Sequence, residues 1–335
     1  MNAILTLSPK DRHDLFNEAG ARLGLPPFHI EKDFWVCWTL CALFRAPKLN
    51  AHLTFRGGTS LSKGWDLIER FSEDIDLSMA RGWFPDVKDP AEAGISSAER
   101  ERRLKGLRNE CRKVIAEVLC PVLTGEASKV PEPIRIEVEE LEKARDPFCI
   151  YLEYPGTGLT APADYNRAMV KIELSGRADG WPMEERTISP YVVRAFPDFC
   201  SGATLSLSCV RPERTFWEKA ALVHEQNTRP GERSISPRQA RHLYDLCRLW
   251  RVAKNSEGFR ALFDGVVAHR RGYFDYTWVD YDALSPGSLR LVPPEKRLAE
   301  WRADYSAMQP MFFAEAPDFK AVIALLREIE ITLAG

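Results

Sequence analysis

Two aspartates, Asp74 and Asp76, stand one residue apart in the segment "FSEDIDL". The alternation in "DIDLSM" predicts a strand, and side chains two positions apart on a strand share one face. Two carboxylates on one face raise each other's pKa unless a cation neutralises them. Because magnesium usually binds one or two carboxylates together with substrate phosphates, the pair fits a metal site. The alternative is an ordinary solvent-facing edge strand, since a single Asp-x-Asp is common by chance.

A glycine turn, "GGTS" at residues 57–60, follows the apolar strand segment "HLTF" and precedes the acid pair. Apolar residues recur at helical spacing after the turn, so the turn opens a helix whose first backbone N–H groups lack partners. Such amides and the helix dipole favour a phosphate, and Thr59 and Ser60 add hydroxyl donors. The order is not that of a Walker A loop. A tight turn with a capped helix is the alternative, but the turn and the acids together favour a nucleotide site.

A third carboxylate, Glu173, lies in the segment "KIELSGR". Alternation places Lys171 and Glu173 on one face of a strand and Ile172 on the other. If this strand lies beside that of the acid pair, Glu173 joins the metal site. Three carboxylates, two metal ions and a triphosphate are the ingredients of in-line nucleotidyl transfer. The alternative is a Lys171–Glu173 pair on a solvated face.

The elements that must position these residues fall into two regions of the 335-residue chain. Three alternating runs, at 134–140, 148–154 and 168–177, predict an antiparallel meander. The pattern after the strand segment "LSLSCV" is mostly helical. We therefore expect an α+β fold, with a mixed sheet flanked by helices over 1–205 and a mainly helical region over 206–335.

The lack of a recognisable targeting signal and the use of cysteine predict a cytoplasmic protein without a membrane partner. The N-terminus lacks the basic and apolar regions of a signal peptide, and the apolar run at 34–44 is too short to span a bilayer. The eight cysteines contain no Cys-x-x-Cys pair. We interpret them as reduced thiols rather than as a disulfide framework or a zinc site.

Basic residues gather in two segments, although the net charge of the whole chain is −2. Residues 100–113 hold seven Lys and Arg against two Glu, and residues 229–254 hold seven against one Glu and one Asp. Such clusters suit a phosphate-rich partner, but solvated helix faces are the alternative. The aromatic segment 273–282 stacks on bases or, more commonly, belongs to the core. The candidate nucleic-acid contacts are Arg102, Arg103, Lys105, Arg108, Arg238 and Arg241.

Five segments, "GGTSLSK", "FSEDIDL", "KIEL", "FWEKAALVHE" and "RQARHLYDL", follow one another in this chain. Their order resembles that of the AbiEii/AbiGii toxin family, minimal nucleotidyltransferases of the DNA polymerase β-like superfamily. The resemblance covers nearly the whole chain. It implies that 1–205 is the nucleotidyltransferase domain and that 206–335 completes the nucleotide and acceptor site.

The resemblance also implies roles for single residues. Asp74 and Asp76 match the metal-binding acid pair, Glu173 matches a recurrent strand of the family, and Lys219 and Asp245 match the third and fourth motifs. The implied catalytic residues are therefore Asp74, Asp76, Lys219 and Asp245, and the implied nucleotide-binding residues are Gly57, Gly58, Thr59, Ser60, Lys63 and Lys219.

Two of these residues have plainer interpretations. Lys219 is either a solvated cation or a residue whose aliphatic stem packs against apolar neighbours. Asp245 pairs with Arg241, four residues earlier on the same helix. Relatives often read Arg-Asp-x-Tyr-Asp-Leu around the last motif, where this chain has His242 in place of the first acid. If that first acid is the working residue of the motif, the assignment of Asp245 is wrong.

The resemblance implies a toxin that transfers NMP from an NTP, with Mg²⁺ or alternatively Mn²⁺, to an RNA acceptor. The 3′ end of tRNA is the expected acceptor, in a toxin–antitoxin or phage-defence system with a cognate antitoxin protein. The alternatives are nucleotidyl or phosphoryl transfer to a protein, or an inactive nucleotide-binding protein. The sequence leaves the NTP, the tRNA species and the oligomeric state open.

Overall fold

The computed structural model describes residues 1–159, 168–199, 202–231, 234–274 and 276–335. The chain divides into two compact units. The first unit comprises Met1–Trp65, Phe71–Val87 and Lys105–Val210, and the second comprises Asp66–Arg70, Lys88–Leu104 and Arg211–Gly335. The second unit thus takes in two short segments of the N-terminal half, which a division at a single residue does not describe.

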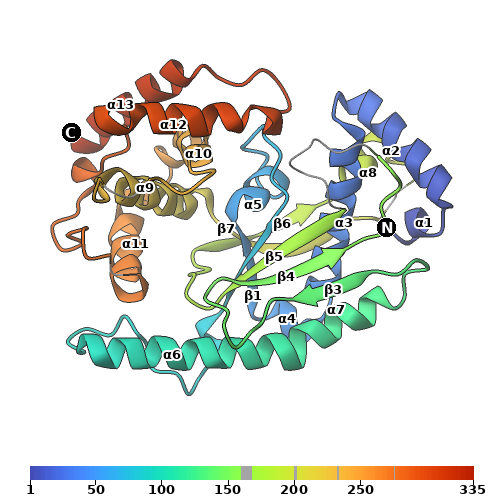
Figure 1. The fold of residues 1–335 in the computed structure, drawn as a ribbon, viewed down its shortest axis with the longest axis horizontal. Coiled ribbons are helices and arrows are strands. Elements are labelled where there is room, and N and C mark those ends of the chain that lie inside the picture. Colours follow the sequence, from blue (N-terminus) through green and yellow to red (C-terminus); the bar gives the residue numbers. More distant parts are fainter. Residues whose placement is uncertain (160–167, 200–201, 232–233, 275) are drawn as a thin grey trace. The chain divides into compact units, whose positions relative to one another are not determined.

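A seven-stranded mixed sheet forms the centre of the first unit, in the order β3-β4-β5-β2-β1-β7-β6 (Figure 1). β2 runs parallel to β5 and β1 runs parallel to β7, whereas every other neighbouring pair is antiparallel. The fold is therefore of the expected class, a mixed sheet flanked by helices. The strands are β1 (Leu53–Arg56), β2 (Ile75–Met79), β3 (Arg135–Val138), β4 (Phe148–Glu153), β5 (Met169–Ser175), β6 (Met183–Ile188) and β7 (Leu205–Val210).

The predicted antiparallel meander is confirmed as β3-β4-β5. Its alternation has a direct cause, since Ile150 and Ile172 face each other in register and are both fully buried. Strand β6 was not among the sequence predictions. Its residues, "MEERTI", are mostly exposed at the edge of the sheet and carry no alternation that would reveal a strand.

The helices of the first unit follow their sequence signals. Helix α2 begins after Ser8, whose hydroxyl accepts a hydrogen bond from the Asp11 N–H at 3.1 Å, and ends at Gly24 in the left-handed conformation. Helix α3 is almost entirely buried, as its apolar composition predicts. The helices are α1 (Asn2–Leu5), α2 (Pro9–Leu23), α3 (Pro27–Phe44), α4 (Pro47–Asn50), α5 (Gly57–Lys63), α7 (Cys120–Ala127) and α8 (Tyr191–Ala195), with a 3₁₀ turn at Arg81–Trp83.

Helix α6 (Ser97–Val114) begins in the second unit and ends in the first, and a π-helical turn at Ile115–Leu119 joins it to α7. The remainder of the second unit is helical, as predicted for the C-terminal region. Its core includes the parallel stack of Trp217 on Phe259, with ring centroids 4.4 Å apart. The helices are α9 (Pro212–Thr228), α10 (Ala240–Ala253), α11 (Phe259–Tyr273), α12 (Glu295–Ala307) and α13 (Phe319–Ala334), with 3₁₀ turns at Pro286–Ser288 and Gln309–Met311.

The described residues bear on the expectations for membrane-spanning helices and for the cysteines. Among them, no helix combines the length and the apolar character needed to cross a bilayer. The seven cysteines that the structure describes are free thiols, and five of them are buried. Cys200, the eighth, lies outside the described residues.

Candidate active site

The glycine turn and the acid pair meet in the first unit. Strand β1 ends at Arg56, opposite Asp76 on β2, and α5 begins at the next residue, Gly57. Gly57 has a φ of +75°, and a Cβ atom added to it would lie 1.9 Å from Oδ2 of Asp76. The Asp76 carboxylate therefore occupies the place that any other side chain at 57 would need, which explains the glycine at this position.

The hydroxyl groups of the turn bond to the protein backbone. Thr59 Oγ1 donates to the carbonyl of Asp74 at 2.6 Å, and Ser60 Oγ donates to the carbonyl of Gly57 at 3.0 Å. Both residues are buried. The structure thus differs from the expectation that these hydroxyls serve a phosphate, because Thr59 ties the turn to the segment that carries the acids and Ser60 bonds within the turn.

Asp76 and Glu173 lie on neighbouring strands, which is the arrangement that the sequence analysis made the condition for a shared site. Asp74 directly precedes β2, and Asp76 is in register with Glu173 on the parallel strand β5. The carboxylate of Glu173 accepts a hydrogen bond from Lys171, which is the plainer alternative for this residue. Burial alone would lower the pKa of Lys171, but Glu173 and, more weakly, Asp74 raise it.

The described side chains do not form a three-carboxylate cluster around the acid pair. Across the described ranges, no group of three or more His, Cys, Asp or Glu side chains is placed to hold a metal ion. Magnesium needs only one or two protein carboxylates when phosphates supply further oxygen ligands, so the expectation that Asp74 and Asp76 bind it stays a prediction. The role of Glu173 as a ligand stays a prediction that its pairing with Lys171 does not support.

Lys63 lies in the core rather than at a binding surface. Its Nζ is 2.7 Å from Oδ1 of Asp33, and both side chains are 4% exposed. The ammonium also lies 3.8 Å from the ring centroid of Tyr191. These partners account for the buried charge, so the surroundings of Lys63 do not support the expected role in nucleotide binding.

The second unit brings Lys219 and Asp245 together. Lys219 Nζ, from α9, is 2.9 Å from Oδ2 of Asp245 on α10, and both residues are buried. Arg70 completes the cluster, with its Nε donating to Oδ1 at 2.8 Å and its Nη2 to Oδ2 at 2.7 Å. Burial alone would raise the pKa of Asp245, but Arg70 and Lys219 outweigh it and hold that pKa far below its usual range. Asp245 is therefore a buried carboxylate anion held by two cations.

His242 belongs to the same cluster. Its Nδ1 lies 3.3 Å from Lys219 Nζ, and its side chain is buried. Burial and then the nearby charges of Lys219 and Arg241 lower the pKa of His242 well below its ordinary value. The ring is neutral at neutral pH, so Nδ1 accepts a hydrogen bond from the ammonium.

The sequence model of one family matches residues 38–325, most of the 335-residue chain. That family is described as "Nucleotidyl transferase AbiEii toxin, Type IV TA system". The chain belongs to this AbiEii family. It is therefore a nucleotidyltransferase toxin of the type IV toxin–antitoxin class, which implies a cognate antitoxin.

Two further comparisons accompany this assignment. The chain is similar to MenT4, a nucleotidyltransferase toxin from Mycobacterium tuberculosis H37Rv, at 16% identity and a TM-score of 0.45. That similarity covers 98% of this chain and 100% of MenT4. No curated protein sequence matches the chain.

Arg70 is the residue of this AbiEii protein that sequence reasoning missed. Asp245 was expected either to act at the site or to pair with Arg241, whereas the structure gives it Arg70 and Lys219 as partners. Arg70 lies 175 positions from Asp245. No periodicity links residues so far apart, so the only available signal was that Arg70 directly precedes the acid-pair segment.

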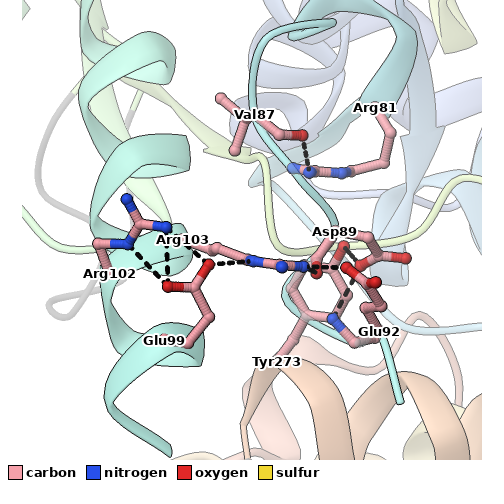
Figure 2. A network of polar contacts seen from close by, with 9 residues as sticks. Arg81, Val87, Asp89, Glu92, Glu99, Arg102, Arg103 and Tyr273 are labelled. Atoms are coloured by element: carbon pink, nitrogen blue, oxygen red, sulfur yellow. Dashed lines mark hydrogen bonds and ion pairs between the residues drawn. The ribbon is translucent and has the colours of Figure 1, made fainter. Parts of the chain in front are cut away.

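The basic segment on α6 is partly neutralised by its own acids. Figure 2 shows Arg103 reaching from α6 to Asp89 and Glu92 while Glu99 binds both Arg102 and Arg103. These hydrogen bonds lower the pKa of Glu99 to about 2. The side chain of Arg103 is only 9% exposed, against 74% for Arg102. Arg103 thus has partners within the chain, and its contact with nucleic acid stays a prediction that this burial does not support.

Other basic and aromatic candidates also have hydrogen bonds within the protein. The backbone N–H of Arg238 donates to the Asp304 carboxylate at 2.6 Å, which fixes the backbone just before α10. This contact does not involve the guanidinium group of Arg238. In the aromatic segment, Trp278 and Tyr281 both donate to Glu225, at 3.0 and 2.8 Å. These aromatic residues therefore follow the core interpretation, and Asp275 in that segment lies outside the described residues.

Proposed function

We propose that this AbiEii-family toxin transfers NMP from an NTP to an RNA acceptor, most specifically the 3′ end of tRNA. The observation that carries the proposal is the contact between the carboxylate of Asp76 and the bare backbone of Gly57. It joins a phosphate-type turn to an acid-bearing strand within one unit. Family membership then supports nucleotidyl transfer over other phosphate chemistry.

The first unit supplies groups for the phosphates and for a divalent cation. The backbone N–H groups at Gly57 and Gly58 begin α5 without a side-chain cap, and the Asp76 carboxylate lies in the space beside Gly57 that a side chain there would fill. Thr59 fixes the backbone of Asp74 through its 2.6 Å hydrogen bond. The turn and the acids are therefore held at a constant spacing, which positioning catalysis requires.

Asp74 and Asp76 would hold the magnesium ion, for which Mn²⁺ is a substitute. The donor set fits, because both groups are hard carboxylate oxygens and magnesium accepts one or two of them beside phosphates. A bound ion polarises the α-phosphate and stabilises the leaving pyrophosphate. The half-buried position of both carboxylates limits their hydration and strengthens their interaction with a cation.

Lys219 is the further cation that we propose for the nucleotide. We assign Lys219 to a phosphate oxygen and Asp245 to holding Lys219, because Asp245 itself is fully buried between two cations. Asp245 therefore positions the lysine rather than contacting the acceptor. Catalysis under this proposal consists of positioning and charge neutralisation, as is usual for transfer at phosphorus.

Incubation of the purified protein with total tRNA and each α-labelled NTP tests the proposal. We expect label in tRNA with one preferred NTP, and no label with Asp74→Ala/Asp76→Ala or after chelation of divalent cations. Ligation of an adaptor to the free 3′ end reports where the label lies. Label that enters a protein while tRNA stays unlabelled overturns the RNA part of the proposal.

The position of the label in the NTP distinguishes nucleotidyl transfer from phosphoryl transfer. Transfer of α-label reports nucleotidyl transfer, whereas transfer of γ-label with no α-label reports phosphorylation. The non-enzymatic alternative, an inactive nucleotide-binding protein, is tested by growth. If expression of Asp76→Ala slows growth as much as expression of the wild type, catalysis is not the source of toxicity.

The same growth assay addresses the biological setting that we propose. NTPs and tRNA are cytoplasmic, so we place the toxin there, with its cognate antitoxin and a role in phage defence. Co-expression of the antitoxin is expected to restore growth of cells that carry the wild-type toxin. Phage plating on cells with the complete pair, compared with Asp76→Ala, measures the defence role.

A further inference from the structure

The ammonium group of Lys219 has two protein acceptors. It carries three N–H donors. One points to Asp245 at 2.9 Å and another to His242 Nδ1 at 3.3 Å, and both acceptors lie on α10, three residues apart. Residues three apart on a helix share a face, so α10 presents both acceptors to the lysine from one side. Within the described residues, the third N–H of Lys219 has no acceptor.

The two acceptors differ in charge. Asp245 is an anion and compensates the lysine, whereas the imidazole of His242 is neutral and accepts through Nδ1 with its proton on Nε2. The charged groups that act on this ring are Lys219, Arg241, Asp245 and Arg70. A neutral acceptor orients an ammonium without cancelling its charge, whereas a second carboxylate would cancel it and would also repel a phosphate.

We propose that His242 is a positioning residue for the nucleotide, which holds Lys219 so that its remaining N–H and its positive charge are directed to a phosphate oxygen. This inference rests on the proposed function, since it takes Lys219 as the phosphate ligand. It assigns a role to the one position at which this chain departs from the Arg-Asp-x-Tyr-Asp-Leu pattern. His242 does not contact the nucleotide and acts through Lys219 alone.

Substitutions at His242 separate orientation from packing. In His242→Asn the side-chain oxygen takes the approximate place of Nδ1, so nucleotide affinity stays within about threefold of the wild type. In His242→Leu the acceptor is lost, and the Kd for the NTP rises about tenfold, the usual effect of losing a hydrogen bond to a charged group. In His242→Asp the added carboxylate competes with the phosphate, and the Kd rises at least as much.

His224 provides a matched control. It is a buried histidine of the same unit, 7% exposed, whose Nδ1 accepts from the backbone N–H of Arg290 at 3.0 Å and not from a lysine. His224→Leu removes a buried imidazole of equal size. It lowers the melting temperature as His242→Leu does, but it leaves the Kd for the NTP unchanged.

The Kd is measured by titration calorimetry with each NTP and Mg²⁺, without an acceptor, on the full chain. KM and kcat from the tRNA-labelling assay give the second readout, and the effect of His242→Leu is expected in KM. Wild-type Kd in His242→Leu, equal loss in His242→Asn, or equal loss in His224→Leu each overturns the inference. Wild-type protein that binds NTP but labels no RNA contradicts the proposed acceptor and leaves this test intact, whereas wild-type protein that binds no NTP overturns both.

Discussion

The position of the Asp76 carboxylate depends on the absence of a side chain at Gly57. The 1.9 Å separation between Asp76 Oδ2 and the place of a Cβ at 57 means that a side chain there must displace the carboxylate. Sequence reasoning predicted a site role for both residues from the turn, the acid pair and their order. It did not find their contact, because register across two strands is a property of the sheet.

Gly57→Ala is expected to lower nucleotidyl transfer at least about a hundredfold, because the acid moves and the φ of +75° becomes strained. Gly24→Ala is the matched control. Gly24 has a similar φ of +68° in the same unit, but nothing lies within 4 Å of its missing Cβ. Both variants lose about 1 kcal/mol of stability from strain. Equal activity loss in both variants would contradict the contact argument.

Arg70→Met is expected to lower the free energy of unfolding by about 3–5 kcal/mol, because it leaves Asp245 buried with only Lys219, among the described residues of the cluster, as a cation partner. Lys129→Met is the control, since its ion pair with Glu126 is exposed and contributes little. Chemical denaturation of both variants measures the difference. A loss in Arg70→Met no larger than in Lys129→Met would show that the cluster does not depend on the arginine.

At the scale of the element, α6 has two kinds of basic residue. Arg103 ties the helix to Asp89 and Glu92, and the segment 88–96 is further anchored by Tyr273, whose hydroxyl donates to Asp89 at 3.0 Å (Figure 2). Exposed cations such as Lys105 are the ones that remain for a polyanion. Charge counting along the sequence cannot separate these groups, because burial and the choice of partner are set by packing.

We predict opposite results for two neutral substitutions on α6. Lys105→Gln lowers affinity for tRNA and reduces the slope of log affinity against log salt by about one. Arg103→Gln leaves tRNA affinity nearly unchanged but increases cleavage within 88–96 in limited proteolysis, because three hydrogen bonds to that region and to Glu99 are lost. A salt slope that falls with Arg103→Gln and not with Lys105→Gln would reverse this assignment.

Both units of the molecule contain a buried histidine whose pKa is lowered. Burial, followed by the charge of Lys32, lowers the pKa of His29 in the first unit to about 4. Burial, followed by the charge of Arg290, lowers the pKa of His224 in the second unit to about 4. Both residues are neutral in the folded protein at pH 7. The unfolded chain binds more protons than the folded chain between pH about 6.5 and 4, so both units lose stability across this window as the pH falls.

His224→Asn is expected to reduce this loss. The asparagine does not titrate, and its oxygen keeps an acceptor for the Arg290 N–H. The variant therefore avoids a penalty of at most about 3 kcal/mol that the wild type incurs between pH 6.5 and 4. Calorimetric melting of both proteins across that range measures the effect. A parallel decline in both proteins would show that His224 does not contribute to acid sensitivity.

Patterns in the sequence predicted the fold class, the meander, the helix-rich C-terminal region and the family. These follow from local periodicity and from motif order, which are properties of neighbouring residues. The tertiary structure alone decided which charges meet. It placed Lys63 against Asp33 and gave Asp245 the distant Arg70, and among the described residues it chose the Lys171–Glu173 pair, one of the two alternatives for Glu173, over a three-acid cluster. Partners far apart in the chain are chosen by packing and by the cost of burying an uncompensated charge, and no spacing in a sequence records that choice.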